Sequence, residues 1–223
     1  MIRRALLSIV AVAALAAPAR AEQLARDDRA PRTDAERDAA MRAAMRTYFR
    51  GELQEAAAFL GVGIGTAFFA GSSIPRGDFG VGFASAVLPV SAIEIGAGLV
   101  LLIRTEGQLA DLAALHAKSP ARYRAEELPR MQQVNFWFDV YKGIEIGLIA
   151  LGAGSIVFGA VDDRDGFIGA GVGLAAQAGA MLTFDLVAED RADTYTERIE
   201  ALTPAPVVRP VVGPSGVGVV GTF

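Results

Sequence analysis

Four apolar segments, nearly free of charge, dominate the sequence and restrict the folds that it can adopt. They are Ala56–Ile74, Phe79–Ile103, Gly143–Val161 and Phe167–Phe184. Each is about as long as the roughly 20 residues that an α-helix needs to cross the hydrocarbon core of a bilayer. Inside lipid, backbone polar groups must bond to each other, which favours helices. The sequence therefore predicts an all-α, polytopic membrane protein with four transmembrane helices.

The composition agrees with a membrane protein and argues against several other classes. Of the 223 residues, 52% are apolar, and the charged residues gather between the apolar segments. The net charge of -4, without a basic patch, predicts no nucleic-acid partner. Cysteine is absent and His116 is the single histidine, which leaves no cysteine metal site, thiolate nucleophile or Ser-His-Asp triad. We expect a non-enzymatic protein without a cofactor.

The first 21 residues have the form of a secretory signal peptide. Two arginines precede an apolar run from Ala5 to Ala17, and an Ala-Arg-Ala sequence ends at Ala21. An uncleaved signal anchor is the alternative interpretation. We expect residues 22–32, which are charged and lack an apolar period, to form a disordered linker. The segment predicts export in a bacterium and a location in the inner membrane.

The remaining chain is predicted to pair its apolar segments into two helical hairpins with helical extensions outside the membrane. Thr33 and Glu36 form a capping box at the first helix, and Ser119 caps a helix that ends before Pro129, where another helix begins. Alternating valines near the C terminus are typical of a strand, but the helical remainder argues against a barrel. The predicted parts are the first hairpin with an amphipathic N-terminal extension (33–103), a polar helical connector (104–137), the second hairpin with a C-terminal extension (138–202) and a flexible Pro/Gly/Val tail (203–223).

Two signals in the sequence predict opposite orientations in the membrane. The signal peptide places the mature N terminus in the periplasm, and four spans return the C terminus there. Basic residues, however, are numerous in Glu22–Gln54 and Arg104–Lys142. In contrast, the two tight turns predicted within the hairpins, Pro75–Gly80 and Asp162–Phe167, have one each, Arg76 and Arg164. The positive-inside rule therefore favours the reverse orientation. We follow the signal peptide because it acts first during insertion.

Small residues recur at intervals of four and predict close helix packing. Lipid supplies no hydrophobic drive between helices, so a close approach of their backbones must hold them together. We expect this packing inside the four-helix bundle, with contacts between copies of the chain as the alternative. The glycines that form these pairs are Gly61 and Gly65, Gly143 and Gly147, and Gly169 and Gly173.

Glu94 is the deepest charged residue in the predicted spans. It lies nine residues before Ile103, about 13 Å along a helix, close to mid-membrane. A charge there costs about 2.5–3.5 kcal/mol. Its helical neighbours Ser91 and Gly98 are small, so this face should point into the bundle, where Gln177 of another span can hydrogen-bond to the acid. A proton or cation site centred on Glu94 is the alternative.

A network of ion pairs is predicted where the spans leave the membrane. Asp139, Lys142 and Glu145 follow at intervals of three on one helix face, so the lysine can pair with either acid. Arg104 and Asp185 end two other spans on the same side of the membrane. These pairs would stabilise the bundle at the membrane boundary.

The function predicted from these features is that of an integral membrane protein acting as a structural or interaction component of the bacterial cell envelope. Its surroundings are the lipid bilayer, and the partner expected is a second copy of the chain or another envelope protein. The alternative class is a small transporter or channel component that uses Glu94.

Overall fold

The computed structural model describes residues 33–202, 207–213 and 216–222. The chain divides into two compact units, Met1–Ala40 and Met41–Phe223. The predicted signal peptide (1–21) and linker (22–32) lie outside the described residues. In the first unit, Thr33 and Glu36 bond to each other's backbone N–H groups at 3.0 and 3.2 Å, which confirms the capping box.

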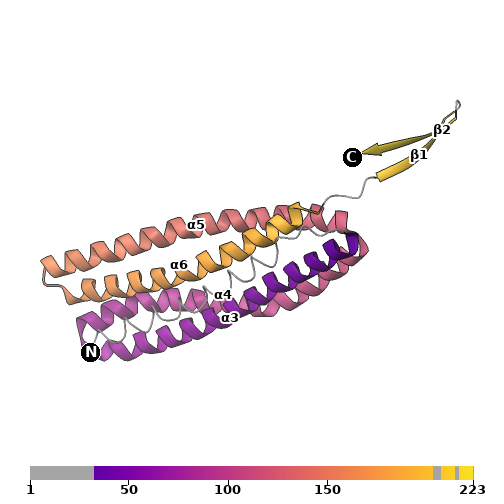
Figure 1. The fold of residues 1–223 in the computed structure, drawn as a ribbon. Helices are drawn as coiled ribbons and strands as arrows, with labels where there is room; N and C mark the ends of the chain where they lie inside the picture. The colour runs from indigo at the N-terminus through magenta and orange to yellow at the C-terminus, as the bar shows by residue number, and fades with distance from the viewer. Residues whose placement is uncertain (1–32, 203–206, 214–215, 223) are drawn as a thin grey trace. The chain divides into compact units, whose positions relative to one another are not determined.

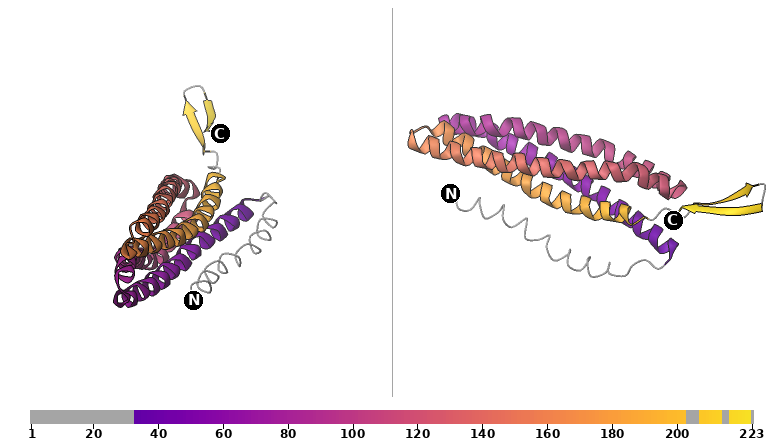
Figure 2. Two further views of the ribbon diagram at one scale, coloured as in Figure 1. Left: turned by 90° about the vertical axis from the view of Figure 1, so that its left-hand side faces the viewer. Right: turned by 90° about the horizontal axis from the view of Figure 1, so that it is seen from above.

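Four long helices account for most of the described chain (Figure 1). All four are long and apolar enough to cross a membrane, which confirms the predicted fold class. Within residues 41–202 they lie side by side, and Figure 2 shows the same arrangement from two other directions. The helices are α3 (Asp34–Ser73), α4 (Asp78–Lys118), α5 (Pro120–Val161) and α6 (Asp165–Glu200).

The helices are too long to lie entirely within a membrane. Each has between 36 and 42 residues, and a helix of 40 residues is about 60 Å long. The hydrocarbon core is only about 30 Å thick, so roughly half of each helix extends beyond it. We call the polar halves the outer bundle, which consists of residues 41–55, 104–118, 120–142 and 185–200.

Short turns join the apolar ends of the helices. The 3₁₀ helix η1 (Ile74–Arg76) and Gly77 connect α3 to α4. Gly77 has a φ of 85°, a conformation that a residue with a side chain adopts only with strain. Asp162–Arg164 connect α5 to α6, with Asp163 at a φ of 54°. Both turns lie where the sequence predicts them.

The two helices of the polar connector are continuous with the spans. Ser119 separates α4 from α5, and its side chain accepts a hydrogen bond from the backbone N–H of Arg122 at 3.3 Å, which confirms the predicted cap. The prediction that a helix begins at Pro129 is wrong, because α5 continues through this residue. Glu127 and Met131, on either side of the proline, are buried, so tertiary contacts hold the helix together despite the lost hydrogen bond.

The large apolar side chains that are buried lie mainly between the helices of the outer bundle. Many large apolar side chains of the spans instead point outward, where lipid would surround them. In the spans the buried cluster consists of small residues and one valine, Ala70, Ala84 and Val87, while Phe68 is 80% exposed. Such a division is expected when lipid surrounds one half and water the other. The outer-bundle cluster consists of Met41, Met45, Tyr48, Phe49, Tyr123, Met131, Ala192, Tyr195 and Ile199.

Glycines allow the spans to approach each other, but only some of them are those predicted from the sequence. A Cβ atom added at Gly169 would collide with the backbone of Phe79, and one at Gly173 would lie 2.8 Å from Val87. Gly152 and Gly171 face each other across α5 and α6 in the same way. The other four predicted glycines have open space where a Cβ would lie and do not pack within the described bundle: Gly61, Gly65, Gly143 and Gly147. Spacing reveals a small-residue stripe but not the direction that it faces.

Two strands lie in the tail, which the sequence predicted to be flexible. Strands β1 (Val207–Gly213) and β2 (Gly216–Thr222) pair in antiparallel fashion, with Val207 opposite Thr222 and Gly213 opposite Gly216. Valine is β-branched and favours extended backbone, which explains the strands. Pro210 in β1 lacks an N–H group, which is tolerated in an edge strand.

Candidate functional site

Glu94 of α4 and Gln177 of α6 meet inside the spans. Glu94 is 1% exposed and Gln177 is 4% exposed. The side-chain amide of Gln177 donates to Oε2 of Glu94 at 2.5 Å and to the hydroxyl oxygen of Thr66 in α3 at 3.4 Å. The hydroxyl groups of Thr66 and Ser91 lie 2.8 Å apart. Polar side chains therefore join α3, α4 and α6 at the depth of Glu94.

Small residues make room for this polar group between α3 and α4. A Cβ atom at Gly63 would lie 3.0 Å from the carbonyl oxygen of Ser91 and 3.2 Å from Cβ of Glu94. A Cβ atom at Gly98 would lie 2.8 Å from the carbonyl oxygen of Ala56. The two backbones are therefore close enough to exclude lipid from Glu94.

One oxygen of Glu94 has no hydrogen-bond partner in the described part of the chain. This atom, Oε1, is fully buried. The neighbour of the other oxygen is a neutral amide rather than a basic side chain. An uncompensated charge is expensive inside a membrane, so chemically the group can serve as a neutral hydrogen-bonding acid or exchange a proton or small cation.

Lys142 lies at the membrane boundary and joins α5 to α6. Its ammonium group lies 2.9 Å from Oδ1 of Asp139 and 2.5 Å from Oε1 of Glu189. These two acids are its described ion-pair partners, and Glu145 is not among them. Glu189 was absent from the predicted network because it lies 47 residues away, on a helix whose rotation the sequence does not define.

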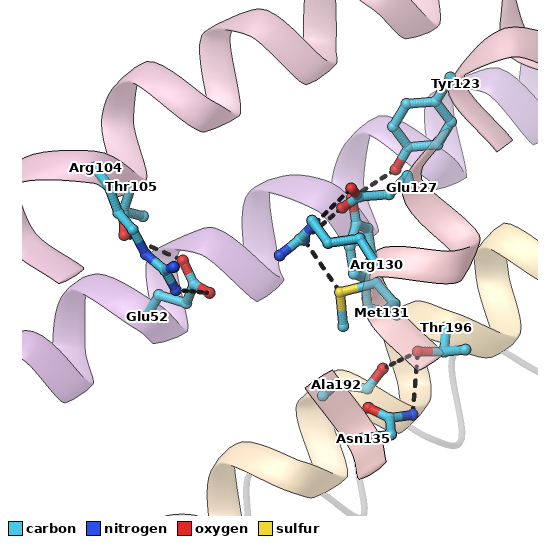
Figure 3. A network of polar contacts seen from close by, with 11 residues as sticks. Glu52, Arg104, Thr105, Tyr123, Glu127, Arg130, Met131, Asn135, Ala192 and Thr196 are labelled. Carbon is cyan, nitrogen blue, oxygen red and sulfur yellow. Dashed lines mark hydrogen bonds and ion pairs between the residues drawn. The ribbon is translucent and has the colours of Figure 1, made fainter. Parts of the chain in front are cut away.

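Arg104 also belongs to the boundary, but its partner comes from α3. Its guanidinium group lies 3.7 Å from Oε1 of Glu52, and the Thr105 hydroxyl donates to Oε2 of the same acid at 3.1 Å (Figure 3). Nearby, Arg191 of α6 pairs with Glu55 of α3. Glu52, Glu55 and Arg191 were not among the residues predicted for this network.

Glu145 and Asp185, the remaining members of the predicted network, face each other between α5 and α6. Glu145 is 2% exposed and Asp185 is 9% exposed. The contacts on either side of them, Lys142 with Glu189 and Gly152 with Gly171, place the two acids opposite each other in this antiparallel helix pair. The five predicted residues thus form three separate groups: Arg104 with Glu52, Lys142 with Asp139, and Glu145 with Asp185.

A second buried polar cluster lies in the outer bundle and was missed in the sequence. The hydroxyl groups of Tyr123 and Tyr195 lie 2.5 Å apart, and Tyr195 donates to Oε1 of Glu127 at 3.1 Å. The guanidinium group of Arg130 donates hydrogen bonds to both carboxylate oxygens of Glu127, at 2.6 and 2.7 Å (Figure 3). Burial is the main cause that raises the pKa of both tyrosines above its ordinary value, which keeps their hydroxyl groups available as donors.

This tyrosine cluster binds α5 to α6 and α3. Glu127 is 1% exposed and Tyr123 is fully buried. The ring of Tyr48 in α3 stacks on Tyr195 with centroids 4.7 Å apart, and the Arg130 guanidinium lies 5.9 Å from the Phe49 ring centre. One local feature of the sequence could have indicated this cluster: the spacing of Tyr123, Glu127 and Arg130 places them on a single helix face.

The described residues include no group of three or more His, Asp or Glu side chains placed to hold a metal ion. The chain matches no protein-family model, and comparisons with curated proteins and with solved structures found no match.

Proposed function

We propose that this chain is a non-enzymatic integral membrane protein that serves as a structural or interaction component of a bacterial cell envelope. The observation that carries the proposal is the outer bundle, in which parts of all four helices close around one core of large side chains. A protein that needed only to cross the membrane would not require this second core. We infer that the outer bundle carries the structural or interaction role and that the spans anchor it in the membrane.

The polar side chains between the helices support this role. Gln177 joins α6 to α4, Lys142 joins α5 to α6, and Thr105 joins α4 to Glu52 of α3. A hydrogen bond between two membrane helices stabilises their association by about 0.6 kcal/mol on average. The described polar contacts therefore connect the four helices to one another and hold the outer bundle in one arrangement. The envelope location is supported by the signal-peptide pattern of residues 1–21.

A second candidate function is favoured by the buried oxygen of Glu94. Oε1 has no hydrogen-bond partner within the described chain, and an acid at this depth is a common feature of proton relays and ion pathways. Glu94 would then take up and release a proton or a small cation as part of a transporter or channel.

One variant distinguishes the two functions. In the structural role, Glu94→Gln keeps a polar group opposite Gln177 and should change the free energy of unfolding by about 1 kcal/mol. Proteoliposomes with the wild-type chain should show no more proton or cation uptake than protein-free vesicles. The measurements are denaturant unfolding in bicelles and the fluorescence of a pH or cation indicator inside the vesicles.

The matched control is Glu126→Gln, which changes an exposed acid of the outer bundle. If wild-type vesicles carried a proton or cation flux that Glu94→Gln abolished and Glu126→Gln preserved, the structural role would be wrong and the transport role supported.

A further inference from the structure

Glu145 and Asp185 form an unusual contact at the membrane boundary. Both residues are at least nine-tenths buried. The contacts of Lys142 with Glu189 on one side and of Gly152 with Gly171 on the other place the two residues opposite each other across α5 and α6, so the charges on their carboxyl groups would repel each other. Neither oxygen of Glu145 receives a hydrogen bond from an N–H or O–H donor of the described chain. The buried neighbour of one acid is therefore another acid.

The basic side chains around this pair are bound to other acids. Lys142 lies one helical turn before Glu145 but contacts Asp139 and Glu189. From the other helices, Arg191 of α6 pairs with Glu55 of α3, and Arg104 of α4 pairs with Glu52 of α3. Two ionised groups at Glu145 and Asp185 would thus add two negative charges to a region where the cations are already engaged.

Two carboxylates cannot hydrogen-bond to each other, because both are acceptors. Adding one proton converts the contact into a short bond between an acid O–H and a carboxylate, and it removes the repulsion between like charges. We propose that Glu145 and Asp185 form a binding site for one proton, which they share and which joins α5 to α6. This site goes beyond the proposed function, which requires no ligand.

The shared proton makes the stability of the bundle depend on pH. In the unfolded chain the two acids are separate, and free carboxyl groups ionise at about pH 4. At neutral pH the folded protein therefore binds a proton that the unfolded chain has released. Stability falls with rising pH wherever the folded state binds more protons than the unfolded state, so unfolding should become easier as the pair loses its proton.

The test measures the thermal midpoint of the purified full-length chain in detergent as a function of pH. We expect the wild-type midpoint to fall from mildly acidic to alkaline pH, with a linkage slope of about one proton. Glu145→Gln and Asp185→Asn each supply an amide that donates to the remaining carboxylate, so each should flatten the slope. Asp139→Asn, which changes an acid that is 71% exposed on the same helix, should keep it.

Three results would overturn the proposal. The first is a wild-type midpoint that does not change with pH, and the second is a slope that persists in Glu145→Gln. The third is stabilisation at alkaline pH by sodium chloride beyond that given by choline chloride, because it would show a metal cation in place of the proton.

Infrared spectroscopy of the wild type keeps the proposal testable if both variants fail to fold. A protonated carboxyl band that titrates with pH should shift when glutamate or aspartate carboxyl groups carry ¹³C, because Glu145 and Asp185 share the proton. The band should also remain in Glu94→Gln. If it disappeared in Glu94→Gln, or if neither label shifted it, the proton would not belong to Glu145 and Asp185 and the proposal would be wrong.

Discussion

Replacing Gly169 with valine should prevent α4 and α6 from packing and should cost about 3 kcal/mol or more in free energy of unfolding. A Cβ atom at this position would collide with the carbonyl oxygen of Phe79 and lie 3.0 Å from the backbone nitrogen of Phe83. Backbone atoms of a long helix cannot shift as the end of a flexible side chain can. Relief would require α4 to move away along much of its length, which would also weaken the contact of Glu94 with Gln177.

The control for this prediction is Gly147→Val. The sequence places both glycines in the same spacing pattern, but no atom lies within 4 Å of a Cβ added at Gly147. Urea unfolding of both variants in bicelles should therefore separate them, with Gly147→Val close to the wild type. Equal losses would contradict the packing of α4 against α6 described above. A change in oligomeric state without a loss of folding in Gly147→Val would assign its stripe to contacts between copies of the chain.

Tyr195→Ala should be the most damaging change in the outer bundle. The side chain is 1% exposed and stacks on Tyr48, and truncation of a buried aromatic residue to alanine costs about 3–5 kcal/mol. The same change removes the hydroxyl group that bonds to Tyr123 and Glu127. Tyr195→Phe keeps the ring and loses only these bonds, so it should cost about 1–3 kcal/mol.

Limited proteolysis and near-ultraviolet circular dichroism would measure this effect. In Tyr195→Ala, cleavage should become faster in the outer bundle, while the apolar segments stay protected by detergent or lipid. The control is Phe136→Ala, which removes an aromatic ring that is 60% exposed and should leave the outer bundle resistant. If Tyr195→Ala were as resistant as Phe136→Ala, the outer bundle would not depend on this core.

The fold could be predicted from the sequence because its main determinants are local. Four uncharged segments of membrane-crossing length decide the number of helices, and Gly77 and Ser119 mark places where helices end. The misplaced helix start at Pro129 shows the limit of local rules. There the burial of Glu127 and Met131, contributed by contacts with other helices, outweighs the hydrogen bond that proline removes.

The contacts between helices could be predicted only in part. Glu94 and Gln177 were both recognisable as polar residues in apolar segments, and the structure brings them together. Lys142, in contrast, has Glu145 one turn away but binds Glu189, since the rotation of α6 decides which acid faces it. The rotation of each helix likewise decides that Gly169 of α6 packs against a neighbouring helix and that Gly147 of α5 does not. A single sequence does not contain that information.

We expect the chain to cross the membrane four times, with the outer bundle on one side and both tight turns on the other. Because the chain contains no cysteine, single substitutions at Lys118, Arg76 and Arg164 each report one exposed position. With a membrane-impermeant thiol reagent on intact spheroplasts, we expect labelling of Lys118→Cys, and labelling of Arg76→Cys and Arg164→Cys only after lysis. Labelling of all three before lysis, or of one turn without the other, would contradict the four-span arrangement, and labelling of both turns but not of Lys118→Cys would reverse the proposed orientation.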